Sequence, residues 1–113
     1  MKMQAKISIM VRNMNRSIDF YTKKLGFKLG FRYENDFAYL TGFGIALGLS
    51  EDNSKYCPDK GNLSICFEVK DMGKAVSDLK KKGLSFEFDE DEDCRFASFE
   101  DPDSTPLYLV EKK

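Results

Sequence analysis

The chain has 113 residues, the length of one ordinary domain, and its 18 basic and 19 acidic residues give a net charge of −1. This balance lacks the basic excess of nucleic-acid-binding proteins, so neither nucleic acid nor an anionic membrane is expected as a partner. No apolar segment is long enough for a signal peptide or a membrane span, and a cytoplasmic location is therefore expected. The three cysteines, Cys57, Cys66 and Cys94, are irregularly spaced, which indicates reduced thiols.

The first half of the chain is predicted to form a strand, a helix and three short strands. Apolar and polar residues alternate over residues 5–11, which is typical of a strand with one buried face. Asn13 or Asn15 can cap the following helix, and Gly26 ends it. The apolar stripe of this helix comprises Met14, Ile18, Tyr21 and Leu25. Three further strands are predicted over residues 27–33, 37–41 and 45–50.

The second half repeats the first. Residues 51–61 are polar and rich in turn residues, which indicates a linker, and residues 65–72 (ICFEVKDM) then match residues 7–14 (ISIMVRNM). Asp71 is expected to cap a second helix with a stripe of Met72, Val76 and Leu79. Strands are predicted over residues 84–88, 95–100 and 107–110.

This repeat predicts an α+β fold of two tandem βαβββ modules, residues 1–50 and 62–113. Their cupped antiparallel and mixed sheets are expected to face each other, with the helices outside, in a single domain spanning residues 1–113. Such a cup is suited to holding a small-molecule ligand.

Two motifs give the chain a family resemblance. The first is SIDFY at residues 17–21 followed by LGF at 25–27, and the second is FEDPD at residues 99–103 followed by PLYLVE at 106–111. With these motifs the chain resembles the glyoxalase/bleomycin-resistance/dioxygenase superfamily, also called vicinal oxygen chelate. The usual Gly-Asn after Asp-Pro-Asp is here Ser104-Thr105. By analogy with the bleomycin-resistance branch, a homodimer is expected.

The resemblance also implies a position for a metal. Enzymes of this superfamily hold a divalent ion with four side chains, typically His, Glu or Gln, from the first and last strand of each module. The corresponding positions here are Lys6, Gly48, Ser64 and Tyr108, and none is a conventional ligand. The chain contains no histidine, the commonest ligand and general base. The family's metal site is therefore expected to be vacant, and no cofactor is expected.

Strand alternation predicts which side chains face the cup. For a hairpin that turns at Gly42-Phe43, the expected register pairs Tyr39 with Ala46 and Phe37 with Gly48. Large aromatic residues over small ones would leave room for a flat ligand, although the same rings could simply fill the cup as core. The candidate ligand-binding residues are Met10, Phe37, Tyr39, Cys66, Glu68 and Tyr108.

The polar candidates have alternative interpretations. Glu68 would form an ion pair with Lys6, or else contact a cationic ligand. Cys66 has no histidine to form a thiolate pair and is expected to act as a small apolar residue. The sequence does not fix where Arg32 and Arg95 face, and both are candidates for rim contacts only. The acidic run at residues 87–93 could attract a basic ligand, but such a run is usually a solvated loop.

Three functions are compatible with these features. The favoured one is a metal-independent protein, similar to bleomycin-resistance proteins, that sequesters an aromatic or amphipathic molecule, cationic ones included, without catalytic residues. The alternative is a lyase, isomerase or dioxygenase with a divalent metal at a non-standard site or Glu68 as general base. The third is a regulatory module whose cup is filled by its own side chains.

Overall fold

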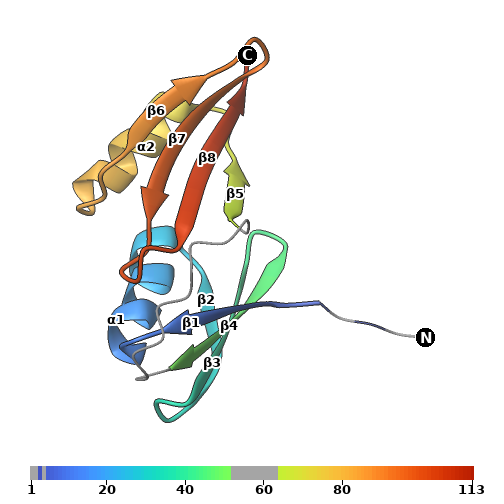
Figure 1. The fold of residues 1–113 in the computed structure, drawn as a ribbon, viewed down its shortest axis with the longest axis vertical. Coiled ribbons are helices and arrows are strands. Elements are labelled where there is room, and N and C mark those ends of the chain that lie inside the picture. Colours follow the sequence, from blue (N-terminus) through green and yellow to red (C-terminus); the bar gives the residue numbers. More distant parts are fainter. Residues whose placement is uncertain (1–2, 4, 52–63) are drawn as a thin grey trace. The chain divides into compact units, whose positions relative to one another are not determined.

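The computed structural model describes residue 3, residues 5–51 and residues 64–113 (Figure 1). The chain divides into two compact units, Met1–Tyr56 and Cys57–Lys113. Each unit contains a four-stranded mixed sheet and its own helix, which confirms the predicted α+β fold of two βαβββ modules. Apart from Glu51, the predicted linker lies outside the described residues, as does Cys57. That both modules form one domain stays a prediction.

The first unit follows the predicted order of elements. It comprises β1 (Ile7–Val11), α1 (Met14–Asp19), η1 (Phe20–Leu25), β2 (Lys28–Tyr33), β3 (Phe37–Gly42) and β4 (Ile45–Glu51). The strand order is β1-β4-β3-β2, with β1 parallel to β4 and the other pairs antiparallel. α1 packs against β3 and β4, and the side chains that face it form the core. The most deeply buried strand residues are Val11, Ala38, Leu40, Leu47 and Leu49.

The first helix departs from the predicted α-helical stripe. From Phe20 onward it widens into a π-helix, and the Gly26 amide donates to the Tyr21 carbonyl five residues earlier at 3.1 Å. The wider turn buries Phe20 and Tyr21 together, whereas Leu25, a member of the predicted stripe, is only half-buried. Gly26, at φ 102°, ends the segment as predicted.

The turn between β3 and β4 corrects the predicted register. Phe43 and Gly44 form a two-residue turn with φ of 53° and 81°, one residue later than expected. When the turn moves one residue along the chain, each residue of β3 pairs with a residue of β4 two positions further on. A shift of two positions leaves every side chain on the same face of the sheet. The observed pairs are Gly42 with Ile45, Tyr39 with Gly48, and Phe37 with Ser50.

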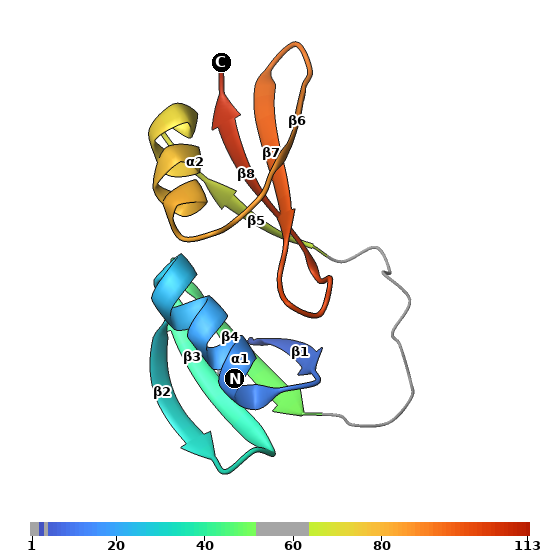
Figure 2. The same ribbon diagram turned by 90° about the vertical axis from the view of Figure 1, so that its left-hand side faces the viewer.

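The second unit repeats this architecture with a regular helix. It comprises β5 (Ile65–Glu68), α2 (Met72–Lys81), β6 (Glu87–Glu90), β7 (Cys94–Glu100) and β8 (Pro106–Lys112), in the strand order β5-β8-β7-β6. α2 packs against β7 and β8 on one face of the sheet (Figure 2). Met72 and Val76 are buried and Leu79 is half-buried. None of the helices in the described part of the chain has the length and apolar character needed to cross a membrane.

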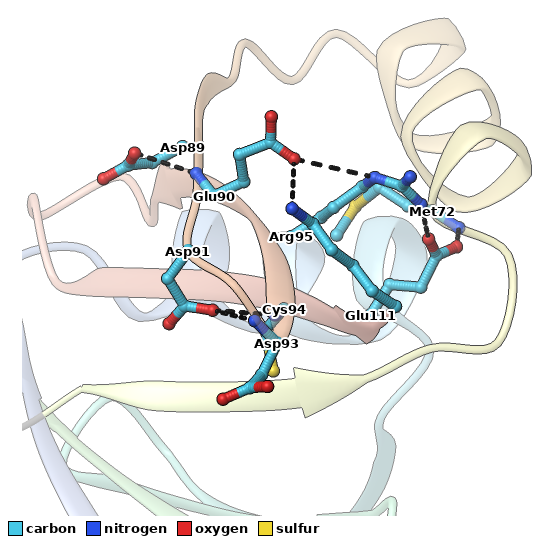
Figure 3. Close-up of polar contacts among 9 residues, drawn as sticks. Met72, Asp89, Glu90, Asp91, Asp93, Cys94, Arg95 and Glu111 are labelled. Atoms are coloured by element: carbon cyan, nitrogen blue, oxygen red, sulfur yellow. Dashed lines mark hydrogen bonds and ion pairs between the residues drawn. The ribbon is translucent and has the colours of Figure 1, made fainter.

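The acidic run at residues 87–93 is not simply a loop. Glu87–Glu90 forms the edge strand β6, antiparallel to β7, and only the residues after it make a turn. In that turn the Asp91 carboxylate accepts hydrogen bonds from the amides of Asp93 and Cys94, at 2.8 and 2.7 Å (Figure 3). β6 begins three residues later than the strand predicted over residues 84–88, and because both of its faces are exposed, no apolar alternation marks its bounds. Its charges disfavour pairing with another chain.

Each helix is capped at its start by a side chain that precedes it and by a glutamate from the last strand of its unit. The predicted caps Asn13 and Asp71 accept from the amides three residues on, each at 3.0 Å. In addition, the last residue of β4, Glu51, accepts from the Met14 amide at 2.9 Å, and Glu111 in β8 accepts from the Met72 amide at 2.6 Å (Figure 3). The repeat thus extends to the glutamate that joins each last strand to the start of its helix.

Glu111 predicts a pH-dependent stability. Its hydrogen bond from the Met72 amide, followed by its contact with Arg95 at 2.8 Å, lowers its pKa. A lowered folded-state pKa contributes stability above the ordinary glutamate pKa, and this contribution is lost as the pH falls through the folded value. Glu111→Gln should therefore lower Tm by several degrees at pH 7, and the difference from wild type should shrink on acidification below about pH 4. Melting curves from pH 7 to pH 3 test this, with Glu92→Gln in the exposed turn as control. A constant difference would contradict it.

The Asp-Pro-Asp turn predicts a stabilising substitution. Asp101 is buried and accepts from the amides of Asp103 and Thr105, at 2.9 and 2.8 Å. Ser104 sits between them with φ of 67°, a conformation that favours glycine. Ser104→Gly should therefore raise stability by about 0.5 kcal/mol, because relief of the backbone strain exceeds the added chain entropy. Urea denaturation measures this, and Ser98→Gly, in the strand β7, should destabilise instead.

Candidate ligand-binding site

Four aromatic side chains share the face of the first sheet that points away from α1. Along β3, Ala38 and Leu40 are fully buried toward the helix, so Phe37 and Tyr39 project from the other face. Phe31 stacks on Tyr39 with a centroid separation of 5.6 Å and an interplanar angle of 14°. Its ring centroid also lies 5.8 Å from that of Phe37. We call this set the aromatic face, and it comprises Phe31, Tyr33, Phe37 and Tyr39.

Two glycines let two of these rings lie close to the backbone of the sheet. A Cβ atom at Gly48 would lie 3.0 Å from Cε2 of Phe37, and one at Gly30 would lie 3.0 Å from Cδ1 of Tyr39. Both rings therefore occupy space that any other residue would fill with its side chain. Gly48 is buried beneath Phe37 in consequence.

A groove of about 650 Å³ lies beside this face, within the first unit. Tyr39, Thr41 and Lys6 contribute its larger side chains, and small residues surround them. The Lys6 Nζ atom lies 4.5 Å from the centroid of the Phe37 ring, at cation–π distance. The remaining lining residues are Ala5, Ile7, Gly42, Gly44, Ile45 and Ala46.

The corresponding face of the second sheet is more polar. The Tyr108 hydroxyl forms hydrogen bonds with Cys66 and Ser64, and its ring centroid lies 6.0 Å from that of Phe96. The hydrogen bond with Cys66 raises the pKa of Tyr108, because the protonated phenol is the donor, and the bond from Ser64 opposes this shift only partly. Glu68 pairs with Val110 further along and is exposed.

The predicted site residues therefore form two groups, one in each unit. Phe37 and Tyr39 are neighbours on the first sheet, and Met10 joins them because its partner Ser50 also pairs with Phe37. Cys66 and Tyr108 are in contact on the second sheet, with Glu68 beyond them on the same strand. The predicted ion pair between Lys6 and Glu68 would join the two units and stays a prediction.

Phe31 and Tyr33 were not predicted as site residues. A β-bulge between Leu29 and Phe31 shifts the register of β2, which places Phe31 opposite Tyr39 and Tyr33 opposite Phe37. The feature of the sequence that could have indicated this bulge is Gly30, which interrupts an otherwise regular strand pattern.

The two arginines with unassigned faces have contacts within their own units. Arg32 donates to the Glu34 carbonyl and to Asn35 Oδ1, both at 2.6 Å, next to the β2–β3 turn. Arg95 lies on the helix side of the second sheet, and its Nη1 atom donates a hydrogen bond to Glu111 Oε1 at 2.8 Å (Figure 3).

The residues at the family's four metal positions do not fit a divalent ion. Lys6 is an ammonium without a lone pair, and its Nζ lies over the Phe37 ring; Gly48 has no side chain. Ser64 and Tyr108 carry hydroxyls that are poor ligands while protonated, and the Cys66 contact favours the protonated phenol of Tyr108. Among the described residues, no three His, Cys, Asp or Glu side chains come together in a metal-holding group.

Comparison with known proteins places the chain in a family. Residues 4–106 match the sequence profile of the Glyoxalase/Bleomycin resistance protein/Dioxygenase superfamily. No curated protein sequence matches the chain.

Several solved structures share the fold. A glyoxalase family protein from Enterococcus faecalis is 22% identical, with a TM-score of 0.80 over 97% of this chain and 98% of the other. The genomically encoded fosfomycin resistance protein FosX from Listeria monocytogenes is 14% identical, with a TM-score of 0.81 over 100% and 95%. A glyoxylase/bleomycin resistance protein/dioxygenase domain from Frankia is 22% identical, with a TM-score of 0.79 over 100% and 93%. The profile match and the shared fold together show that this chain belongs to the glyoxalase/bleomycin resistance protein/dioxygenase superfamily.

Proposed function

We propose that this protein binds and sequesters a small aromatic molecule without a metal and without chemical turnover. The observation that carries the proposal is the aromatic face beside an open groove, with Phe37 and Tyr39 lying close over Gly48 and Gly30. A flat ligand can extend such a stack and exchange water for ring contacts, which favours binding. The unsuitable groups at the four metal positions support a metal-independent role. The bleomycin-resistance-like character is part of this proposal.

The predicted ligand-binding residues are assigned different contacts with the ligand in this function. Tyr39 lines the groove and is proposed as the main ring contact, with Phe37 and Met10 extending the apolar surface on the same face. Glu68 and Tyr108 are proposed as polar contacts from the second unit, and Cys66 as a small apolar contact. A cytoplasmic location and a homodimer belong to the same proposal. Light scattering after size exclusion that gives only monomer at micromolar concentration would count against the dimer.

Ligand-dependent stabilisation tests the function directly. In a thermal-shift screen of planar antibiotics and aromatic metabolites, at least one compound should raise Tm, because a ligand at 100 times its Kd stabilises the folded state by about 2.7 kcal/mol. Tyr39→Ala should abolish the shift, and Phe88→Ala, an exposed ring of the second unit, should retain it. Because Tyr39 is half-exposed, the variant should fold, which circular dichroism checks.

The same assay separates binding from metal-dependent catalysis. Addition of EDTA, Mn²⁺, Ni²⁺ or Zn²⁺ should leave Tm and the ligand shift unchanged. A stoichiometric divalent metal in protein purified without chelator would overturn the proposal, as would a screen in which no aromatic compound binds.

A further inference from the structure

The groove of the first unit carries charge of one sign. Among the described residues that line it, Lys6 is the charged one, and the others are apolar, small or hydroxyl-bearing. On the same face, Lys28 lies opposite Thr41, which also lines the groove, and adds a second positive charge nearby. A ligand in this groove therefore meets a positive potential as well as the aromatic ring of Tyr39.

A ring of its own unit orients the Lys6 ammonium. Its Nζ atom lies over the Phe37 ring at 4.5 Å, and the Lys6 Cδ atom lies 3.6 Å from where a Gly48 Cβ would be. Among the described residues of the first unit, no carboxylate comes within ion-pair distance of Lys6, and the side chain is exposed. A cation–π contact orients an ammonium but leaves donors free for an anion.

Tyr39 supplies a fixed ring on the other side of the groove. The Tyr39 ring stacks on Phe31 and lies close to Gly30, and both neighbours orient it. The groove then continues past Thr41 and Ala46, where small side chains leave space for a flat molecule. A ring bound against Tyr39 could therefore place a substituent toward Lys6.

We propose that this groove selects planar aromatic anions, with the ligand's carboxylate or other anionic group bound by Lys6 and its ring packed against Tyr39. The inference rests on the proposed function and adds the charge of the ligand. It opposes the cationic ligand that Glu68 and the acidic run had suggested. Within that run, Glu90 lies 2.8 Å from Lys113 Nζ, so part of its charge is balanced inside the second unit.

Three probes of equal ring size test the charge preference. Titration calorimetry or NMR should show that 2-naphthoate binds about tenfold more tightly than neutral 2-naphthalenemethanol, and that 2-naphthylmethylammonium binds most weakly. The preference should weaken at high salt, since the ion pair is open to solvent. Lys6→Met should bring the ratio of naphthoate to alcohol affinity close to one while the alcohol still binds. Lys74→Met, which removes one charge from the other unit, should leave the ratio unchanged.

The outcomes distinguish this inference from the proposed function. If the alcohol binds through Tyr39 but naphthoate gains nothing, or if the ammonium binds best, the charge preference is wrong and the binding function survives. If Lys6→Met keeps the preference for naphthoate, the inference is also wrong, because a residue other than Lys6 would then bind the anionic group. If none of the three probes binds but a compound of the thermal-shift screen does, the inference fails and the binding function survives. If no aromatic compound binds in either experiment, both fail.

Discussion

Phe20→Ala is expected to lower the free energy of unfolding by about 3–4 kcal/mol, more than Leu25→Ala, for which a loss of about 1–2 kcal/mol is expected. Phe20 is 4% exposed, and its ring makes an edge contact with Tyr21 at 5.2 Å. Leu25 is only half-buried, so truncation there removes less apolar contact. Urea denaturation of both variants measures the difference.

The comparison tests the π-helix itself. An α-helical stripe of period 3.6 would bury Leu25 and turn Phe20 outward, so it predicts the opposite ranking of the two losses. Ser77→Ala, on the exposed side of α2, provides a control for helix substitution, and its effect should stay within about 0.5 kcal/mol. Equal losses at Phe20 and Leu25, or a larger loss at Leu25, would contradict the wider turn.

The parts of the fold that follow from local rules could be predicted from the sequence. The repeated strand and helix patterns gave both modules, and Asn13 and Asp71 begin their helices as capping chemistry requires. The features of the fold that were not predicted each arise from one inserted or displaced residue. The π turn at Phe20, the hairpin turn at Phe43 and the bulge near Gly30 each leave the apolar pattern nearly unchanged while altering which side chains meet.

The candidate site was only partly predictable for the same reason. Alternation placed Phe37 and Tyr39 on the face away from the helix, because a register error of two residues preserves the face. It did not reveal Phe31 beside them, or that Gly48 lies beneath Phe37 rather than opposite it. Such contacts depend on how each ring leans across neighbouring strands, which periodicity does not encode.

The contact between Gly48 and Phe37 carries the second large prediction. Gly48→Val should destabilise the protein by about 1–3 kcal/mol, because its Cβ would lie 3.0 Å from Phe37 Cε2 and its methyl groups closer still. The displaced ring would also disturb Lys6, whose ammonium rests on it. Binding of 2-naphthalenemethanol and the preference for 2-naphthoate should therefore both decrease. Denaturation and probe titration measure the two effects.

A double-mutant cycle identifies the ring as the cause. In a Phe37→Ala background the space above Gly48 is open, so the added valine should cost much less, and the coupling energy should exceed about 1 kcal/mol. Gly73→Ala serves as the matched glycine control. Its new Cβ would meet only Asp71 Oδ1 at 3.5 Å, so the gain in helix propensity should stabilise the protein by about 0.5–1 kcal/mol. If valine at position 48 destabilises both backgrounds equally, Phe37 does not rest on Gly48 in solution, and the aromatic face loses the arrangement on which the binding site depends.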